Sequence, residues 1–286
     1  MNMPATAQGP KIALLAMLAV CAIALGAGCG PDKTQDHSSA SPAPGTNPPT
    51  PTPNPGGSTE NRVLRLDGKT ASLRVPDSPS LHSLTNAMTL EVWFKAASFY
   101  RQNGAVNSLL RKNVEANGEN FFLRFRILSG QPVIEMSSGN QVLRAPYDFE
   151  PGTWYHLAGT YDGKVMTVLV NGVVAGSQRF SGSIQMDDSD LMIGKGDPNF
   201  SSGEYFHGDI DEVRLWNVAR SPEQIRAAMN TRLTGKEPGL AAYWTFDDGT
   251  ANDVSTNGNK GVLDGETQIL AVTPPDAPPL SSSPKR

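Results

Sequence analysis

Two dipeptides, Asp162-Gly163 and Asn171-Gly172, constrain the fold of this chain more than any other feature of its sequence. Asp-Gly and Asn-Gly supply the positive φ angles that two-residue hairpin turns require. Strand-forming residues flank both dipeptides, so residues 153–180 are predicted to form a three-stranded antiparallel meander. The sequence therefore points first to an antiparallel β fold.

The rest of the central region supports the same interpretation. Residues 89–96, TLEVWFKA, alternate apolar and polar side chains with the period of a half-buried strand, and residues 121–146 read as a further run of strands. One helix is predicted, because Ser221-Pro222-Glu223-Gln224 is a capping box with proline in the first turn. Many short strands with regular turn signals predict an all-β, two-sheet antiparallel jelly-roll sandwich with one short helix over residues 62–270.

The two ends of the chain differ in composition from this central region. An apolar run from Ile12 to Gly28 follows a single cation, Lys11, and is shorter than the roughly 20 residues of a membrane-spanning helix. This order of basic, apolar and small residues predicts a signal peptide over residues 1–28. Residues 29–61 and 271–286 are rich in Pro, Ser and Thr, and are predicted to be a disordered linker and a disordered tail.

The residues before Cys29, Leu25-Gly26-Ala27-Gly28, resemble the lipobox of bacterial lipoprotein precursors, with the leucine one position early. The resemblance implies export, cleavage before Cys29 and lipidation of its thiol, which would tether the domain to the cell envelope. Gly30 follows the cysteine instead of aspartate, so the resemblance favours the outer membrane or the cell surface. An ordinary signal peptide with an incidental cysteine is the alternative.

Cysteine content and charge exclude several classes of protein. Both cysteines lie within residues 1–29, so the predicted domain has neither a disulfide nor a thiolate metal site. The formal net charge is −4, and it becomes −5 after loss of residues 1–28, where Lys11 is the one charged residue. Without a basic stripe, nucleic acid is not an expected partner.

A succession of motifs in the central region resembles the laminin-G-like and pentraxin branch of the concanavalin A-like lectins and glucanases. The resemblance covers nearly the whole of residues 62–265 and implies the two-sheet jelly roll predicted above. The motifs, in chain order, are Leu66-Asp67-Gly68, Trp154-Tyr155-His156-Leu157-Ala158-Gly159-Thr160-Tyr161-Asp162-Gly163, Val170-Asn171-Gly172, Met192-Ile193-Gly194, Gly208-Asp209-Ile210-Asp211-Glu212-Val213-Arg214-Leu215-Trp216-Asn217, Ala219-Arg220-Ser221-Pro222-Glu223-Gln224-Ile225 and Tyr243-Trp244-Thr245-Phe246-Asp247.

Glycosidases of this fold carry a strand pattern Glu-x-Asp-x-x-Glu, in which the first Glu is the nucleophile and the last is the acid/base. In this sequence Asp209 and Arg214 occupy those two positions. An arginine does not give up its proton at neutral pH, so it cannot replace the catalytic acid. A non-catalytic protein is therefore expected, and a glycoside hydrolase with another arrangement of carboxylates is the remote alternative.

The resemblance to pentraxins also implies calcium ligands, which are carboxylate, amide and carbonyl oxygens. Carried over residue by residue, the ligands of one ion are Glu119, Asn120, Asp197 and Asn199. A second calcium site is predicted to join Asp67 to Asp211 if the first and last strands are neighbours. The alternative is that all six residues are solvated turn residues, since Asp and Asn favour turns.

Four aromatic residues in predicted loops are candidates for stacking on a sugar: Phe99, Tyr100, Phe200 and Tyr205. His156 and the four tryptophans lie in predicted strands, where packing is the expected role. The sequence thus predicts an envelope-anchored binding or adhesion module for a glycan or for an extracellular or envelope protein, with calcium as its one candidate cofactor. A structural component of the cell envelope is the alternative.

Overall fold

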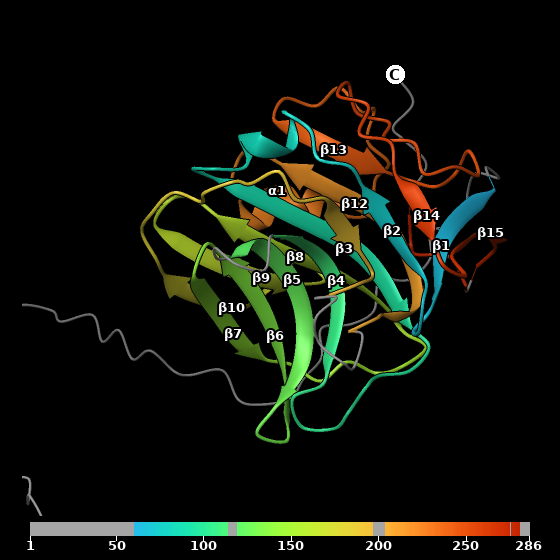
Figure 1. Ribbon diagram of the computed structural model, residues 1–286, viewed down its shortest axis with the longest axis horizontal. Helices are drawn as coiled ribbons and strands as arrows, with labels where there is room; N and C mark the ends of the chain where they lie inside the picture. Colours follow the sequence, from blue (N-terminus) through green and yellow to red (C-terminus); the bar gives the residue numbers. More distant parts are fainter. Residues whose placement is uncertain (1–59, 114–118, 197–203, 275, 281–286) are drawn as a thin grey trace, which may run out of the picture. The chain divides into compact units, whose positions relative to one another are not determined.

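The computed structural model describes residues 60–113, 119–196, 204–274 and 276–280, with no description of the side chains of Asn113 and Glu119. Two antiparallel sheets face each other across one hydrophobic core (Figure 1). The predicted two-sheet sandwich with one short helix, α1 (Pro222–Ala228), is confirmed. Within the described residues, no helix combines the length and apolarity that crossing a membrane requires.

The first sheet has eight strands, and its main path runs β10-β9-β8-β3-β12-β1-β15, with β13 beside β12. We call it sheet A. Its strands, in that order, are β10 (Val173–Arg179), β9 (Val165–Val170), β8 (Trp154–Tyr161), β3 (Met88–Ala96), β12 (His207–Trp216), β1 (Asn61–Asp67), β15 (Gln268–Val272) and β13 (Leu240–Trp244).

The second sheet, sheet B, has seven strands in the order β14-β2-β11-β4-β5-β6-β7. A short 3-10 helix, η1 (Leu81–Ser83), lies in the chain between β2 and β3. The strands of sheet B are β14 (Val262–Asp264), β2 (Ser72–Val75), β11 (Leu191–Ile193), β4 (Val106–Asn113), β5 (Glu119–Leu128), β6 (Gln131–Ser138) and β7 (Gln141–Pro146).

Local sequence signals account for the hairpins and the helix. Strands β8, β9 and β10 form the predicted meander, and Asn171 and Gly172 have φ angles of 48° and 74°, both in the left-handed region that the turn requires. The predicted capping box is also present: the Ser221 hydroxyl accepts from the Gln224 amide at 3.2 Å, and the Gln224 side chain accepts from the Ser221 amide at 2.8 Å.

The outer face of sheet A, which points away from sheet B, is covered rather than solvated. Strand β3 was predicted to be half-buried, and its Leu90, Val92 and Phe94 do face the core. Glu91 and Trp93 point outward but are also fully buried. The segment after α1 covers them, since the Trp93 indole donates to the carbonyl of Met229 at 2.8 Å.

The C-terminal segment adds to this cover, which corrects the prediction that residues 271–286 are disordered throughout. Val272 belongs to β15, and Ala277 and Leu280 pack against a cluster that contains Trp93 and Trp154. The Trp154 indole donates to the carbonyl of Asp276 at 2.9 Å. Proline fixes its own φ angle, so this segment loses little conformational freedom when it docks.

Candidate ligand-binding groove

Strand β12 carries the acidic stretch Asp209-Ile210-Asp211-Glu212, and a bulge in its pairing decides where these side chains go. The register with β3 shifts between Asp211 and Arg214, and Glu212 has a φ angle of 50°. A bulge adds a residue to one strand and re-aims the side chains around it. Asp211, Glu212 and Arg214 are consequently all buried in the polar layer on the outer face of sheet A.

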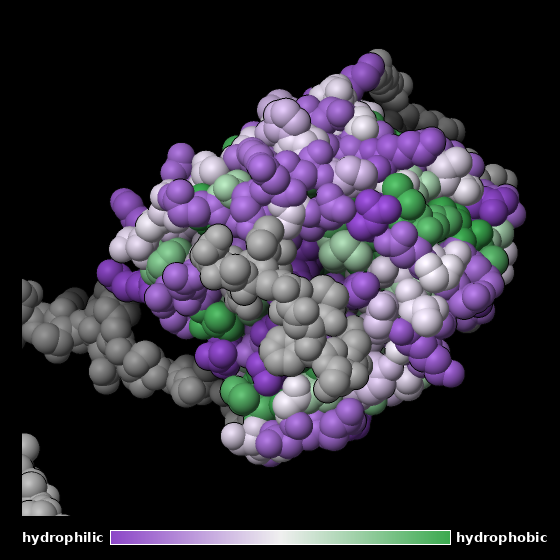
Figure 2. Space-filling model, viewed as in Figure 1, coloured by the Kyte–Doolittle hydropathy of each residue, from purple (hydrophilic) through white to green (hydrophobic). Residues whose placement is uncertain are grey.

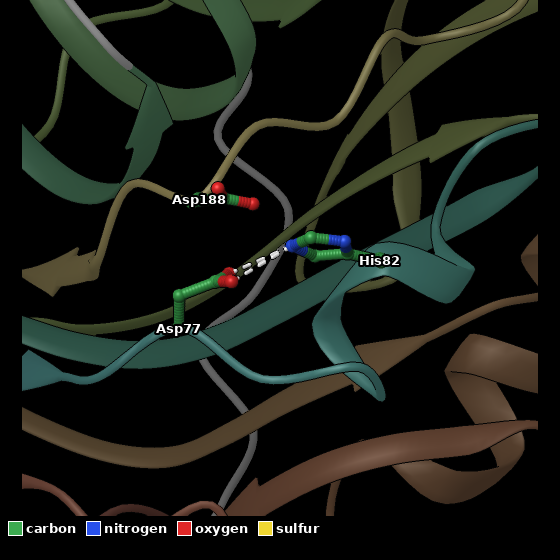
Figure 3. A group of neighbouring side chains, drawn as sticks. All are labelled: Asp77, His82 and Asp188. Atoms are coloured by element: carbon green, nitrogen blue, oxygen red, sulfur yellow. Dashed lines mark hydrogen bonds and ion pairs between the residues drawn. The ribbon is translucent and has the colours of Figure 1, made fainter.

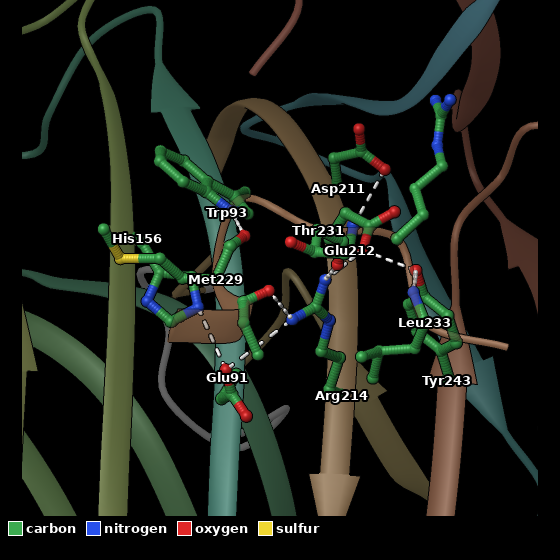
Figure 4. Close-up of polar contacts among 12 residues, drawn as sticks. Glu91, Trp93, His156, Asp211, Glu212, Arg214, Met229, Thr231, Leu233 and Tyr243 are labelled. Carbon is green, nitrogen blue, oxygen red and sulfur yellow. Dashed lines mark hydrogen bonds and ion pairs between the residues drawn. The ribbon is translucent and has the colours of Figure 1, made fainter. Parts of the chain in front are cut away.

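Arg214 is the centre of this buried layer (Figure 4). Its guanidinium lies 2.5 Å from the Glu212 carboxylate and donates to the carbonyls of Ala228 at 3.1 Å and Thr231 at 2.7 Å. The Tyr243 hydroxyl donates to the same carboxylate at 2.5 Å. The arginine therefore joins β12 to β13 and to the segment that follows α1.

Asp211 lies beside this pair and has a different environment. Its carboxylate accepts from the Asn61 side chain at 2.9 Å and from the Glu212 amide at 2.8 Å. Burial and the adjacent charge of Glu212 raise the pKa of Asp211 well above its ordinary value of 3.8. The side chain is fully buried, so this perturbed acid is out of reach of a substrate.

Glu91 and His156 extend the polar layer across β3 and β8. Burial by itself would raise the pKa of Glu91, but contact with His156 and the charges of Arg214 and Arg220 outweigh it and lower the pKa to about 2. Nε2 of His156 lies 3.2 Å from the Glu91 carboxylate, although its angle is outside the range of a regular hydrogen bond. Burial lowers the pKa of His156, so its imidazole is neutral at pH 7.

The pKa of Glu91 predicts a specific loss of stability in acid. Its ordinary value is 4.5 and its folded value is about 2, so the stabilisation is fully present above pH 4.5 and disappears as the pH falls through about 2. We expect the difference in unfolding free energy between wild type and Glu91→Gln to shrink over that range by on the order of 3 kcal/mol. Urea titrations at successive pH values measure it, and a difference that does not change with pH would contradict the assignment.

Asp209 lies apart from this buried layer, in a groove at the end of the outer face of sheet A. It is flanked on neighbouring strands by Arg65 of β1 and Lys95 of β3. Arg65 binds the Asp209 carboxylate through two hydrogen bonds of 2.7 and 3.0 Å, and Nζ of Lys95 lies 3.8 Å from it. The groove has a volume of about 340 Å³, within the size range of small-ligand sites. Its lining consists of Arg65, Leu66, Lys95, Ala96, Ala97, Gly152, His207, Gly208 and Asp209.

The groove combines hydrogen-bonding side chains with exposed backbone. His207 accepts or donates at Nδ1 with the Ser98 hydroxyl at 2.7 Å, which fixes the ring at one wall. A Cβ atom on Gly208 would come within 2.2 Å of the Lys95 carbonyl, so only glycine lets β12 approach β3 this closely. The side chain of Arg65 is 48% exposed, which leaves part of its guanidinium open to a ligand.

None of the three predicted aromatic residues that the structure describes, Phe99, Tyr100 and Tyr205, lines the groove. The Tyr100 hydroxyl donates to the carbonyl of Gly68, and Phe99 packs edge-on against Phe125 at a centroid distance of 5.1 Å. Phe99 instead lines a different, small pocket together with Phe125 and Phe149. Tyr205 stacks under Lys195 at 5.3 Å, and Phe200 lies outside the described residues.

Sequence reasoning therefore missed the charged groove residues Arg65, Lys95 and His207. Two pieces of information together would have located them: the alternation of side chains between the two faces of β1, β3 and β12, and the order of these strands in the sheet. The alternation was readable from the sequence, but the order of the strands was not.

The expected calcium site joining Asp67 to Asp211 is not formed. Strands β1 and β12 are neighbours as predicted, but their register pairs Asp67 with His207, four residues from Asp211. The Asp67 carboxylate accepts from the amides of Lys69, Thr70 and Ala71 in its own turn, and its pKa is lowered to about 2 although burial opposes this. Asp67 is thus a turn residue.

Of the other predicted calcium ligands, the structure describes only the side chain of Asn120, which donates to the Asp187 carboxylate at 2.8 Å. The side chain of Glu119 and all of Asp197 and Asn199 lie outside the described residues. Their convergence with Asn120 on one rim remains a prediction.

A different group of possible metal ligands, Asp77, His82 and Asp188, lies close together near Lys112 (Figure 3). His82 contacts both oxygens of Asp77 at 2.9 Å. The fully buried ammonium of Lys112 donates to Asp77 at 2.6 Å and to the carbonyls of Asp187 and Ser189. Calcium takes six to eight oxygen ligands. This group does not fit calcium, because its oxygens are few and already surround a positive charge.

The surface offers no broad apolar area on the face seen in Figure 2, where hydrophobic and hydrophilic residues are interspersed. Among the described residues, large exposed apolar side chains include two adjacent pairs, Val173 with Val174 and Val262 with Leu263. Small exposed groups of this kind are normal on soluble domains. The groove is therefore the more informative surface feature.

Two antiparallel sheets packed face to face place the domain in the architectural class of β-sandwiches and jelly rolls. Residues 67–226, more than half of the chain, match the family model for laminin G domains described as the concanavalin A-like lectin/glucanases superfamily. The chain belongs to this superfamily, and the predicted resemblance is confirmed.

Comparison with individual proteins supports the fold. A candidate carbohydrate-binding protein from Bacteroides ovatus superposes with a TM-score of 0.60 at 23% identity, covering 77% of this chain and 62% of that one. A heptameric SAP-like pentraxin from Limulus polyphemus gives a TM-score of 0.51 at 18% identity, covering 76% of this chain and 97% of that one. Pappalysin-1 of mouse is 28% identical over 191 residues, which are 61% of this chain but only 11% of pappalysin-1.

Proposed function

We propose that the domain is a non-catalytic carbohydrate-binding module whose ligand occupies the groove of Arg65, Lys95, His207 and Asp209. The observation that carries this proposal is the concentration of these four polar side chains in one groove of about 340 Å³. Sugar hydroxyl groups both donate and accept hydrogen bonds. Arginine and lysine donate, a carboxylate accepts, and the nitrogen atoms of an imidazole can donate or accept, so the lining matches that chemistry.

The backbone of the groove supports the same ligand class. Gly152 lines the groove, is exposed and has open space beside it, so a flat sugar ring can approach its main chain closely. The candidate carbohydrate-binding protein from Bacteroides ovatus has a similar fold, which supports the same class of ligand.

The non-catalytic part of the proposal rests on the charges in the groove. Asp209 is the one carboxylate among the described lining residues, and it faces Arg65 and Lys95. Glycosidases use a pair of carboxyl groups about 5 to 10 Å apart on either side of the scissile bond. The nearby acids Asp211 and Glu212 are buried behind the strand and are unsuited to serve as the second member of such a pair. Asp276 is closer, but it pairs with the Lys95 ammonium at 3.0 Å, and this contact lowers its pKa and makes it a poor proton donor.

We further propose that the protein is exported and tethered by a lipid on Cys29, with residues 29–61 as the spacer that presents the groove at the outer membrane or cell surface. Alkyne fatty acid labelling of cells tests the tether, and labelling that persists in Cys29→Ala would contradict it. We propose that this groove binds its ligand without calcium, because the described residues around it form no cage of calcium-binding oxygens.

The test of the groove is a glycan array probed with residues 30–286, followed by calorimetry on the glycans that bind. Arg65→Gln should weaken binding by about tenfold or more, since a charge-assisted hydrogen bond is lost. Arg179→Gln is the matched control, because it removes the same charge from an exposed position on β10 and should change affinity less than about twofold.

Three outcomes would count against the proposal. Equal weakening by Arg65→Gln and Arg179→Gln would show that the groove is not the site. Loss of binding on addition of EDTA would show that calcium takes part through residues other than those in the groove. An array without any glycan ligand, together with recovery of one stoichiometric envelope protein from membranes, would replace sugar binding by protein adhesion or by a structural role in the envelope.

A further inference from the structure

The outer face of sheet B, which points away from the core and from sheet A, carries a concentration of arginines around one acid. On three neighbouring strands, Arg124 of β5, Glu135 of β6 and Arg144 of β7 stand directly opposite one another. Arg126, two residues along β5 from Arg124, points to the same face. We refer to Arg124, Arg126 and Arg144 as the arginine triad.

The triad is only partly neutralised by its acid. Glu135 is fully buried and accepts from Nε of Arg124 at 2.9 Å and from Nε of Arg144 at 2.8 Å. Nη1 of Arg126 lies 3.8 Å away, which is too long for a hydrogen bond. Three guanidinium groups and one carboxylate leave two positive charges in excess, on a chain whose net charge is −4.

Glu135 holds Arg124 and Arg144 in place through their Nε atoms. Arg126 and Arg144 retain Nη donors for a further acceptor. Arg124 stacks on the ring of Phe122 at 3.8 Å, so its position is fixed by packing as well as by Glu135. Arg144 presents its guanidinium tip to solvent, with its side chain 47% exposed, and Arg126 is 24% exposed. One guanidinium would have been enough to balance the charge of Glu135.

A second observation points to a missing acceptor on this face. Nε of Arg126 is buried and has no hydrogen-bond partner among the described residues. The hydroxyl of Ser108, opposite Arg124 on β4, is likewise buried and unpaired in the described part of the chain. Buried donors without acceptors are costly, and they mark a place where a ligand or an ordered water can supply the acceptor.

We propose that the arginine triad is a second binding site, for the carboxylate or sulfate groups of an acidic polysaccharide. Guanidinium groups bind planar oxyanions through two parallel hydrogen bonds, and Arg126 and Arg144 both retain Nη donors for this purpose. Glu135 holds Nε of Arg124 and Arg144, which orients their outer edges toward solvent. An extended chain is favoured over a single small anion, because the donors lie on β5 and β7, which are separated by two strand spacings of about 4.8 Å each.

This site is separate from the groove on sheet A and does not depend on it. The groove belongs to β1, β3 and β12 on the outer face of the opposite sheet. The two proposals therefore make different predictions for the same variants: Arg65→Gln should leave polyanion binding unchanged, and loss of the triad should leave the groove ligand unaffected.

The test uses dextran sulfate, polygalacturonate and neutral dextran as probes in calorimetry with residues 30–286, at low and high sodium chloride. Arg126→Gln combined with Arg144→Gln should weaken binding of the polyanions by at least about tenfold, since charge-assisted hydrogen bonds are lost. The matched control combines Lys164→Gln with Arg179→Gln, which removes two charges from exposed positions and should change binding less than about twofold. Arg124 and Glu135 are retained in both variants, so the sheet keeps its buried pair.

The two charged polysaccharides distinguish the source of the oxyanion. Preference for polygalacturonate assigns the site to carboxylates, and preference for dextran sulfate assigns it to sulfate esters. Three results would overturn the proposal. They are equal losses in the two double variants, equal binding of poly-glutamate and the polysaccharides, and absence of binding to every polyanion at low salt.

Discussion

Arg214→Met should cost about 3–5 kcal/mol of unfolding free energy, the largest effect that we expect from a single charged residue in this domain. The methionine retains much of the volume but none of the donors. It would leave the carboxylate of Glu212 buried beside Asp211, and it would remove one donor from each of the carbonyls of Ala228 and Thr231. Urea denaturation followed by tryptophan fluorescence measures the loss.

Two comparisons make this result interpretable. Arg226→Met removes an arginine that pairs with Glu223 at an exposed position of α1, and it should cost less than about 1 kcal/mol. Combining Arg214→Met with Glu212→Gln should recover part of the loss, because the buried carboxylate is then neutral. Equal costs for Arg214→Met and Arg226→Met would show that the buried layer does not depend on Arg214.

Lys112→Met is the second large effect, with an expected cost of about 2–3 kcal/mol. Its ammonium is fully buried and donates to Asp77 and to two carbonyls of the segment between β10 and β11. Without it, Asp77 keeps its contact with His82, and the carbonyls of Asp187 and Ser189 lose this donor. The expected cost is below that of Arg214→Met because the Asp77 side chain is 20% exposed and water can reach it.

Thermal unfolding with and without added calcium tests the role of Lys112 as a built-in cation. The wild type should gain no stability from calcium at Asp77, since the ammonium already occupies the space among the oxygens. Lys164→Met, at an exposed turn, is the control and should leave the melting temperature almost unchanged. A stabilisation of the wild type by calcium that Lys112→Met abolishes would refute this interpretation.

Local signals in the sequence determined the class of fold and several of its details. Asn171, Gly172 and Gly163 specify their turns because they adopt positive φ angles, which few other residues do. Asp162 supports the second turn through its side chain, which accepts from the amides of Lys164 and Val165. Ser221 and Gln224 specify the start of α1 because each satisfies a backbone amide of the other. The alternation in residues 89–96 correctly placed Leu90, Val92 and Phe94 in the core. These features depend on neighbours in the sequence and can be read without the fold.

The functional surfaces depended on information that the sequence does not contain. Arg65, Lys95 and Asp209 meet because β12 lies between β1 and β3, and the pairing order of distant strands is set by packing of the whole core. The same register separates Asp67 from Asp211, which proximity of the strands alone had suggested would share an ion.

Burial was the other property that only the tertiary structure decided. The sequence presented Glu91, Asp211, Glu212 and Arg214 as surface or site residues of a half-covered sheet, whereas the segment after α1 and the C-terminal residues up to Leu280 cover that face. Whether an acid is a solvated turn residue, a structural anchor or a ligand-binding group is determined by the distant segments that enclose it. Turn chemistry and side-chain period are local properties of a chain, but strand order and enclosure are not.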